Sequence, residues 1–384
     1  MDWGYEGSTR RRTCMLMVTH ACNLNCSYCY EPYKKNAYMS LDLAKEIILR
    51  EAQFVKESDQ FDELQIDFMG GEPFMNFPLI KAIVEWLETG VIDIPWICFA
   101  TTNGTLLTDE IKAWLREHKT GINLGASYDG TVQMQSTNRG TDKHNIDLNF
   151  FRELWPHQPL HMTISKETLP TLAEGVLDIQ GKGYMVEAVL AQGVDWTIDD
   201  ALMYREQLCT LKDAYLKNIM LTPFNRLTRF VSTYDSSDTE KIQEKWCGTG
   251  KGMATYDIDG KKYGCHMFTP LVCGGKALLA DAVEWDSPES NADDYCKSCV
   301  LRGFCPTCPG FNYKYRGSLA ERDKKWCPIV LAEAITACEF QVEHIAAIDK
   351  LDLQDAQHGQ AALQAYKVLR HLDITKSHSP YTIC

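Results

Sequence analysis

The sequence lacks the features that mark a membrane-spanning, secreted or nucleic-acid-binding chain. No apolar run approaches the roughly 20 residues needed to cross a bilayer. The first residues are polar, and no apolar stretch with a small-residue cleavage site follows them, so a secretory signal is missing. Positive charge is scarce, because 39 Lys and Arg stand against 52 Asp and Glu, and binding phosphates requires a basic footprint. We therefore expect a cytoplasmic protein with no membrane and no nucleic-acid partner.

What the chain does contain is a long stretch of alternating strand and helix patterns. Six short β-rich runs alternate with amphipathic segments such as Leu41–Val55 and Asp109–Glu117. The runs are Thr13–Thr19, Leu64–Met69, Trp96–Thr102, Gly121–Ser127, Leu160–Ser165 and Met185–Ala191. Strands separated by helices pair in parallel, and six units are too few for an eight-stranded barrel. This predicts an α/β fold, either a partial (β/α)6 TIM-like barrel or an open sheet, with reactive residues after the strands' C-terminal ends.

The residue composition of the chain changes toward the C-terminus. From Cys247 to Cys327 it shows short turns, glycines and dense cysteines, which is typical of a segment that packs around metal. Helical patterns follow over Ile329–Ile348 and Gln360–Leu372. The expected divisions are an N-terminal extension at 1–12, the barrel at 13–225, a connector at 226–246, a small cysteine-rich domain at 247–345, and a C-terminal helix and tail at 346–384.

Cysteine is unusually abundant, with 16 residues in the chain. In a reducing compartment these thiols stay reduced, so metal or catalytic use is the better interpretation. Ten fall into two spaced groups. Of the rest, Cys14, Cys98, Cys209 and Cys338 are expected to pack as small hydrophobes, and Cys384 ends a tail.

The first group follows the first predicted strand and reads Cys22-Asn-Leu-Asn-Cys26-Ser-Tyr28-Cys29. Three thiolates with no fourth at short range would hold an iron–sulfur cube and leave one iron open. A zinc site or a ferredoxin loop is the alternative, but those use other spacings. The spacing, with an aromatic residue before the last cysteine, resembles the radical S-adenosylmethionine (SAM) superfamily. This resemblance implies a [4Fe–4S] cluster whose open iron binds SAM, and reductive cleavage of SAM to a 5′-deoxyadenosyl radical.

Further elements that resemble the superfamily follow the next strands. Gly70-Gly71-Glu72-Pro73 ends the second, and the resemblance implies close backbone approach to SAM with Glu72 accepting from its ammonium group. Asn103 and Ser127 follow the third and fourth strands and could hydrogen-bond SAM, while Arg139 could pair with a carboxylate. The alternative is that these are ordinary turn residues and a surface charge.

The second group has seven cysteines. Cys247 and Cys265 flank Gly260, and a Cys-x2-Cys-x5-Cys-x2-Cys run and a final cysteine follow. This resembles the SPASM extension of radical SAM enzymes, except that two residues rather than three separate the last clustered pair. The resemblance implies two auxiliary [4Fe–4S] clusters, one on Cys247, Cys265 and Cys308 and one on Cys296, Cys299, Cys305 and Cys327. Cys273 could complete the first, or its iron could be open to a substrate thiolate. A zinc ribbon is the alternative for the clustered four, but it leaves the other cysteines unexplained.

The reaction is indicated by two shorter features. Sulfatase-maturating relatives have an aspartate base after the second SPASM cysteine, where this chain has His266, which is either a base or a plain cluster neighbour. The stretch Cys305–Tyr313 resembles maturases of ribosomally made peptides with Cys-x-x-x repeats, which implies a thioether bond from a cysteine sulfur to a carbon. The partners so implied are a cysteine-rich precursor peptide and a flavodoxin- or ferredoxin-type electron donor. Too few residues precede the first strand for a winged-helix leader-binding domain, so we expect leader recognition to be absent, supplied by another chain, or built from the C-terminal helices.

Other functions stay open at this point. One is a carbon–carbon crosslinking enzyme or an anaerobic sulfatase-maturating type of protein oxidase. Another, from a different class, is an iron–sulfur electron-transfer protein. The three-cysteine loop and the Gly70–Pro73 element argue against a carrier, because a carrier gains nothing from an open iron.

Overall fold

The computed structural model describes residues 10–140, 146–231, 233, 247–285, 293–305, 307–348 and 353–376. Residues 1–9 of the expected N-terminal extension, most of the 226–246 connector and the last residues of the tail, with Cys384, lie outside the described residues. Among those described, no helix has the length and apolarity to cross a membrane.

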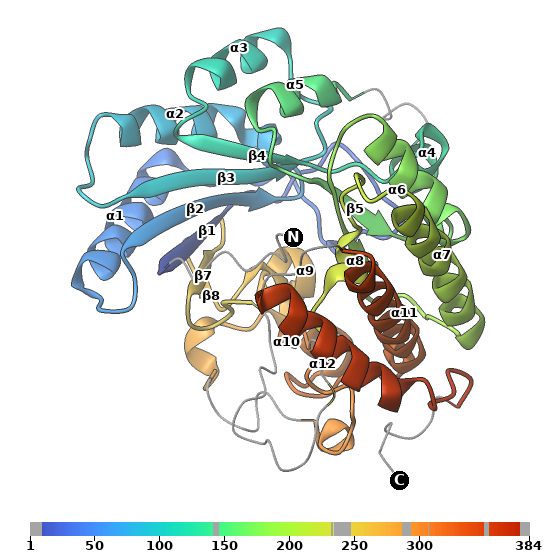
Figure 1. Ribbon diagram of the computed structural model, residues 1–384. Coiled ribbons are helices and arrows are strands. Elements are labelled where there is room, and N and C mark those ends of the chain that lie inside the picture. Colours follow the sequence, from blue (N-terminus) through green and yellow to red (C-terminus); the bar gives the residue numbers. More distant parts are fainter. Residues whose placement is uncertain are drawn as a thin grey trace.

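The strands form a curved arc in which neighbours pair in parallel except at the β7–β8 edge, which confirms the partial-barrel expectation (Figure 1). The six expected strands are β1 (Arg11–Thr19), β2 (Glu63–Gly70), β3 (Trp96–Thr102), β4 (Ile122–Ala126), β5 (Leu160–Ile164) and β6 (Val186–Leu190). The larger sheet has the order β4-β3-β2-β1-β7-β8, and β5 and β6 pair separately. An isolated parallel bridge between Ser127 and His161 joins β4 to β5 and continues the arc.

Two strands of the larger sheet come from the cysteine-rich region and were not predicted. β7 (Met253–Tyr256) pairs in parallel with β1, and β8 (Lys262–Tyr263) returns antiparallel to β7. Thr13 lies opposite Met253 in this pairing. The cysteine-rich region is therefore hydrogen-bonded directly to the first barrel strand.

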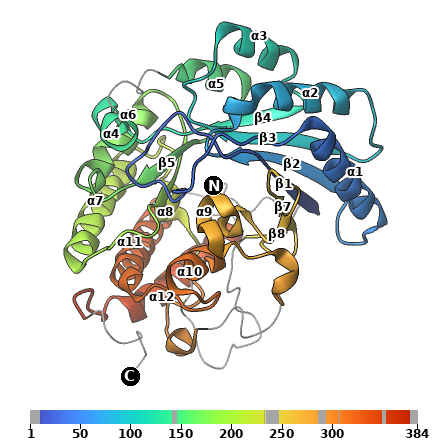
Figure 2. The same cartoon turned by 180° about the vertical axis from the view of Figure 1, so that it is seen from behind.

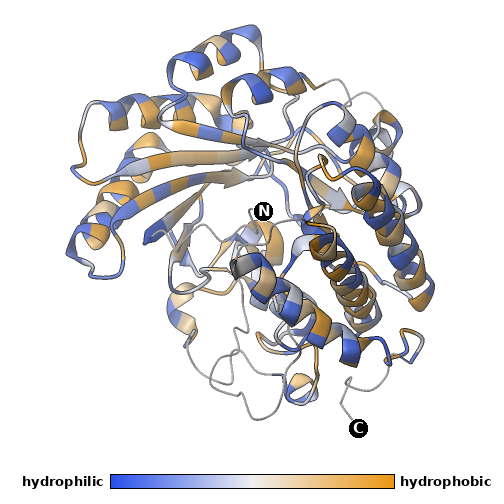
Figure 3. Ribbon diagram, in the orientation of Figure 1, coloured by the Kyte–Doolittle hydropathy of each residue, from blue (hydrophilic) through white to orange (hydrophobic). Residues whose placement is uncertain are grey.

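Helices cover the outer face of the arc. They are α1 (Leu41–Glu57), α2 (Phe77–Glu88), α3 (Asp109–Glu117), α4 (Val132–Arg139), α5 (Leu148–Leu154), α6 (Leu172–Gly181) and α7 (Ile198–Lys217). The sequence explains α1 well, since Ser40 caps its first turn by accepting from the Leu43 N–H, and Ala44, Ile47 and Ile48 share one buried face. Figure 3 shows apolar and polar residues on different sides of such helices.

The C-terminal elements lie on the opposite side of the sheet from α1, α2 and α3, as Figures 1 and 2 show. They are α8 (Asn225–Thr228), α9 (Pro270–Cys273), α10 (Pro309–Arg316), α11 (Cys327–Ala346) and α12 (Leu353–Leu369). The α11 helix is buried along most of its length. Its Glu333 accepts from Tyr204 of α7 at 2.8 Å and pairs with Arg229 after α8, so α11 is tied to both. This arrangement leaves the carboxyl ends of the barrel strands facing the cysteine-rich region.

Candidate active site

The first cysteine group lies in the loop after β1. Cys22, Cys26 and Cys29 are all partly exposed, and the Cys29 N–H donates to the Cys26 carbonyl at 3.1 Å. The pKa of Cys26 is raised to about 11, mainly by burial, with the neighbouring thiols of Cys29 and Cys22 contributing and the charge of Arg139 opposing the rise. The three thiols are thus close enough to interact electrostatically, as a shared cluster requires.

The two glycines that end β2 let this loop pack against the strand. A Cβ atom on Gly71 would lie 2.6 Å from the Ala21 carbonyl oxygen and 2.7 Å from the Cys22 Cβ. A Cβ on Gly70 would lie 2.3 Å from the Thr19 oxygen. A side chain on Gly71 would therefore push the cysteine loop away, and one on Gly70 would clash with the end of β1, so close backbone approach explains both glycines.

Glu72 links the carboxyl ends of β2 and β3. Its carboxylate is 2% exposed and accepts from the Thr102 hydroxyl at 2.7 Å and from the N–H groups of Asn103 at 2.8 Å and Phe74 at 3.1 Å. Burial raises the pKa of Glu72, and these hydrogen bonds oppose the rise. A carboxylate offers about four acceptor sites, so one remains for a further donor.

Asn103 and Ser127 lie at the same edge of the sheet. The Asn103 amide donates to the Asn23 side chain at 3.0 Å, and its oxygen accepts from Thr105 at 2.6 Å, which ties the end of β3 to the cysteine loop. Ser127 donates its N–H to the Thr102 carbonyl at 2.9 Å. Its hydroxyl has no hydrogen-bond partner within the described ranges and is available to a ligand.

Arg139 pairs with a carboxylate of the chain itself. Its Nε lies 2.8 Å from Oδ2 of Asp129, which is fully buried after β4. The same carboxylate accepts from the Tyr28 hydroxyl at 2.7 Å and from the Thr163 N–H at 3.0 Å. Asp129 is not among the site residues predicted from the sequence, although its place after a strand end was the available signal. It joins the cysteine loop, α4 and β5 in one buried network, with Arg139 positioned by that network.

The seven C-terminal cysteines fall into two groups. Set A comprises Cys247, Cys265 and Cys308, and set B comprises Cys296, Cys299, Cys305 and Cys327. Burial raises the pKa of Cys265, and the thiols of Cys308 and Cys247 add to it. Burial likewise raises the pKa of Cys327, and the three other set B thiols contribute. The thiols within each set therefore influence one another electrostatically, and their roles as cluster ligands stay predictions.

Cys273 stands apart from both sets. Its thiol donates to the Met267 carbonyl at 3.1 Å, and the charges that act on it are those of Lys314 and Lys276 rather than of other cysteines. This position gives no support to Cys273 as a fourth member of set A.

A single metal ion does not suit these cysteines. Within the described part of the chain, no three His, Cys, Asp or Glu side chains converge tightly enough to hold one ion. A tetrahedral zinc needs sulfurs about 4 Å apart, given Zn–S bonds of about 2.3 Å. An iron–sulfur cube spaces its thiolates more widely, because irons and sulfides lie between them. The donor sets consist of thiolates alone, which is the donor chemistry that an iron–sulfur cube requires.

His266 lies between set A and the first cysteine loop. It is half-buried beside Cys265, and its Nε2 is 3.2 Å from the Tyr30 hydroxyl. Burial lowers the pKa of His266 to about 4, so the imidazole is neutral at physiological pH.

A cavity of about 380 Å³ connects the two cysteine regions. Tyr28 and Tyr30 line one part, and Cys305 and Cys308 line another. Residues 189–192 at the end of β6 and side chains of α10 and α11 complete the wall. A ligand in this space would therefore contact both the first cysteine loop and Cys308 of set A.

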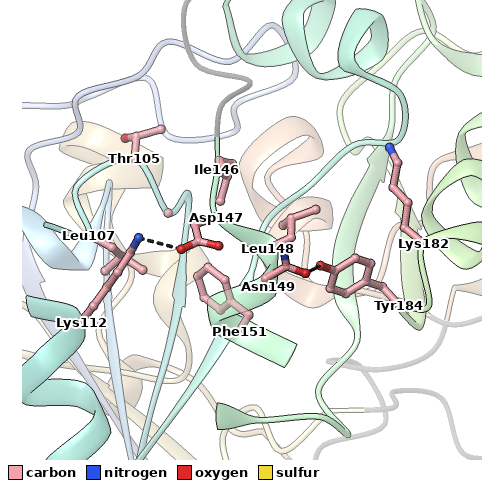
Figure 4. A pocket seen from close by; sticks show the side chains of 11 residues that line it. Thr105, Leu107, Lys112, Ile146, Asp147, Leu148, Asn149, Phe151, Lys182 and Tyr184 are labelled. Atoms are coloured by element: carbon pink, nitrogen blue, oxygen red, sulfur yellow. Dashed lines mark hydrogen bonds and ion pairs between the residues drawn. The ribbon is translucent and has the colours of Figure 1, made fainter. Parts of the chain in front are cut away.

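A second cavity, of about 740 Å³, is larger but lies elsewhere (Figure 4). It contains no cysteine, and its polar side chains pair with one another, Lys112 with Asp147 at 2.8 Å and Tyr184 with Asn149 at 3.0 Å. We assign the site to the smaller cavity because it alone of the two touches the cysteines.

Comparison with curated proteins gives one family and several relatives. Residues 16–128 match the model of the Radical SAM superfamily. The chain is 35% identical over 116 residues to the uncharacterized protein MJ0907 of Methanocaldococcus jannaschii, a match that spans 30% of this chain and 38% of that protein. It is 22% identical over 360 residues to the radical SAM cyclopropyl synthase TigE of Paramaledivibacter caminithermalis, spanning 84% of this chain and 73% of that one.

Solved structures share the fold. The enzyme anSMEcpe with bound AdoMet and the Cp18Cys peptide superposes with a TM-score of 0.64 at 14% identity, over 87% of this chain and 97% of that chain. SuiB of Streptococcus suis bound to its precursor peptide SuiA gives 0.54 at 15% identity, over 83% and 76%. The superfamily match over residues 16–128 and the three-cysteine loop indicate a radical SAM enzyme, and the solved structures share its fold.

Proposed function

We propose that this enzyme is a peptide maturase that forms a thioether bond between a cysteine sulfur and a carbon atom of a ribosomally made precursor peptide. The observation that carries the proposal is the cavity, which brings Tyr28 and Tyr30 of the first cysteine loop into one space with Cys308 of set A. Thioether formation needs both a radical source for the carbon and a site for the sulfur. Two of the similar structures, anSMEcpe and SuiB, were solved with peptides bound.

The radical-generating site would be built from the first loop. Cys22, Cys26 and Cys29 would hold the cluster, and the remaining acceptor site of Glu72 would take the SAM ammonium. The exposed hydroxyl of Ser127 would donate to SAM. Asn103 and Arg139 would act by positioning, Asn103 through the cysteine loop and Arg139 through Asp129. When bound, SAM and the cluster supply a 5′-deoxyadenosyl radical that removes hydrogen from the substrate.

The sulfur would be held by set A. Three cysteines leave one iron of an auxiliary [4Fe–4S] cluster without a ligand from the chain, which is a place for a substrate thiolate. Neutral His266 beside Cys265 would take the thiol proton, with Tyr30 orienting the imidazole through their 3.2 Å contact. Set B would hold a second auxiliary cluster with four chain thiolates. An external donor of the flavodoxin or ferredoxin type would supply the electron that starts each turnover.

Carbon–carbon bond formation is the second candidate, because the match to the cyclopropyl synthase TigE spans most of both chains. The two candidates differ in what happens to the thiol. In a thioether product each crosslink consumes one thiol, whereas a carbon–carbon product leaves every thiol free for alkylation.

The test is anaerobic reconstitution with iron, sulfide, SAM and dithionite, followed by a cysteine-rich precursor peptide encoded beside the gene. We expect 5′-deoxyadenosine, loss of two hydrogen atoms per crosslink, and loss of one alkylatable thiol per crosslink. A Cys247→Ala variant should keep SAM cleavage but lose the product, while Cys209→Ala, on the outer helix α7, should keep both. Loss of hydrogen with every thiol still alkylatable would reject the thioether in favour of the carbon–carbon bond.

A further inference from the structure

The β6 strand has one side that no other strand covers. It pairs with β5, and within the described part of the chain no strand lies on its other side. The Ala191 N–H at its end donates to the Ile164 carbonyl of β5 at 2.9 Å. Successive residues of a strand direct their main-chain N–H and C=O groups to opposite sides. The groups of Ala188 and Leu190 therefore point away from β5, along an outer edge of the sheet.

At Ala188 this outer edge is closed by a side chain. The Ala188 N–H donates to Oδ1 of Asn225 at 3.0 Å, and Nδ2 of Asn225 donates to the Ala188 carbonyl at 3.1 Å. These are the two kinds of hydrogen bond that a neighbouring strand would make. Nε of Arg226 donates to the same carbonyl at 2.9 Å. Side chains of α8 thus take the place of a strand at this one position.

Leu190, two residues farther along the same edge, has no such cover. Its N–H and C=O have no hydrogen-bond partner among the described residues, although Leu190 is only 3% exposed. Main-chain polar groups that are shielded from water are costly to leave unpaired. Leu190 also lines the cavity that contains Tyr28, Tyr30 and Cys308. The uncovered part of the edge therefore lies in the candidate active site.

The cavity wall continues from Leu190 to Gln192. The Gln192 side chain is half-buried, lines the cavity, and has no hydrogen-bond partner in the ranges that the structure describes. Val189 lines the same wall and is 52% exposed. An amide and an apolar side chain thus flank the unpaired main-chain groups of Leu190. This combination matches an extended peptide, which offers an N–H and a C=O at almost every residue and a side chain on alternate sides.

We propose that a segment of the precursor peptide binds in extended conformation along residues 190–192, as an additional strand on the outer edge of β6. This inference rests on the proposed function, since it takes the substrate to be a peptide. The N–H and C=O of Leu190 would each bond a main-chain group of the peptide, and the Gln192 amide would bond the next groups along the segment. Strand addition takes its affinity from main-chain hydrogen bonds and its specificity from alternate side chains.

Asn225 would determine where the peptide lies. Because its amide covers the edge at Ala188, the added strand cannot extend toward the start of β6. The peptide is thereby kept at the carboxyl end of β6, where the cavity reaches Tyr28 of the first cysteine loop. The enzyme would then accept different side chains at the paired peptide residues but would require a free N–H at alternate positions.

The test is amide hydrogen exchange at residue resolution on the reconstituted enzyme with SAM, with and without the precursor peptide encoded beside the gene. Without peptide, Leu190 should exchange faster than Ala191, whose N–H is bonded to Ile164. Saturating peptide should slow exchange at Leu190 by about tenfold, because its N–H gains a hydrogen bond. N-methylation of the peptide, one amide at a time, should weaken binding about tenfold at alternate positions and little at the residues between them.

A variant of the enzyme gives a second measurement. Gln192→Leu removes the donor and acceptor of the side chain at similar size, so the peptide Kd should rise about 5- to 10-fold while the Kd for SAM stays unchanged. Gln133→Leu is the matched control, because Gln133 is exposed on α4 and does not line the cavity. It should change neither Kd. Equal peptide affinities in the two variants would overturn the part assigned to Gln192.

The outcomes separate this inference from the thioether proposal. A peptide that is processed while exchange at Leu190 stays unchanged would overturn the strand addition and leave the thioether standing. Binding that tolerates N-methylation at every position would do the same. Protection of Leu190 with every thiol of the product still alkylatable would support the strand addition and reject the thioether. Absence of any peptide binding would overturn both.

Discussion

The first cysteine loop and the C-terminal sets A and B are supported by different kinds of structure. The first loop lies on the carboxyl ends of parallel strands, held by buried Glu72 and Asp129. Cys308 of set A lies just before the eight-residue helix α10, and Cys327 of set B opens the 20-residue helix α11. If sets A and B hold the clusters proposed above, the cysteine-rich region would depend more on metal than the barrel does, since binding energy there is folding energy.

The largest expected effect comes from removing the first cluster. The triple variant Cys22→Ala, Cys26→Ala, Cys29→Ala should form no 5′-deoxyadenosine above background and lose about four irons per chain. Circular dichroism should show the helices unchanged, because these thiols are partly exposed and outside the strands. The control is Cys209→Ala. Retained SAM cleavage in the triple variant would contradict the assignment.

The next effect tests the dependence of the C-terminal region on metal. Cys327→Ala should keep SAM cleavage within about tenfold but abolish peptide product, because it disrupts a cluster that takes no part in making the radical. Limited proteolysis should cut the variant between residues 247 and 327 while leaving the barrel intact. Cys338→Ala, on the same helix and buried outside both sets, is the matched control. Equal protease resistance in both variants would show that the region folds without set B.

A smaller effect is expected at the edge of the barrel. Glu72→Gln removes a charge and turns one acceptor of the Asn103 N–H into a donor, so we expect SAM to bind about 10- to 100-fold more weakly, or about 1.4–2.8 kcal/mol. The measurement is the Kd for SAM on the reconstituted protein. Glu63→Gln, at the other end of β2 and paired with Arg11, should leave the Kd unchanged. Equal affinities in the two variants would remove Glu72 from the SAM site.

The smallest effect concerns the barrel alone. Burial raises the pKa of Asp67 on β2 to about 6. The folded state thus holds this proton more tightly than the unfolded state, and the stability it contributes is lost as pH rises from about 4 through 6. Asp67→Asn should therefore stabilise the protein at pH 8 by about 1–2 kcal/mol, after allowance for solvent, with the gain shrinking toward pH 4. Thermal melts at both pH values check this, with exposed Asp62→Asn as the control.

Strand and motif positions were largely predictable because local pattern determines them. Trp96–Thr102 and Asp109–Glu117 have the predicted bounds. Other features depend on contacts between distant segments. β7 is four residues long and acquires its role only by pairing with β1. The last helix runs over Leu353–Leu369 rather than the predicted Gln360–Leu372, since its start has little apolar periodicity.

The candidate site also combines features set by local sequence with features set by contacts between distant segments. Glu72 was recognisable from its neighbours in sequence, but the pairing of Asp129 with Arg139 needs α4 to fold back on the strand end. The contact of Tyr30 with His266 and that of Arg229 with Glu333 join segments more than 100 residues apart. No local pattern encodes such contacts, and the cavity they line could not be predicted from the chain.

The pairing of β7 with β1 has a consequence for engineering this family. A chain cut near residue 246 would leave β1 as an open edge with unpaired N–H and C=O groups, a template for aggregation. Transplanting a different C-terminal region, to exchange one chemistry for another, would succeed only if the donor segment carried a strand in the same register. Diversification of such enzymes is therefore constrained by backbone hydrogen bonding as much as by cysteine spacing.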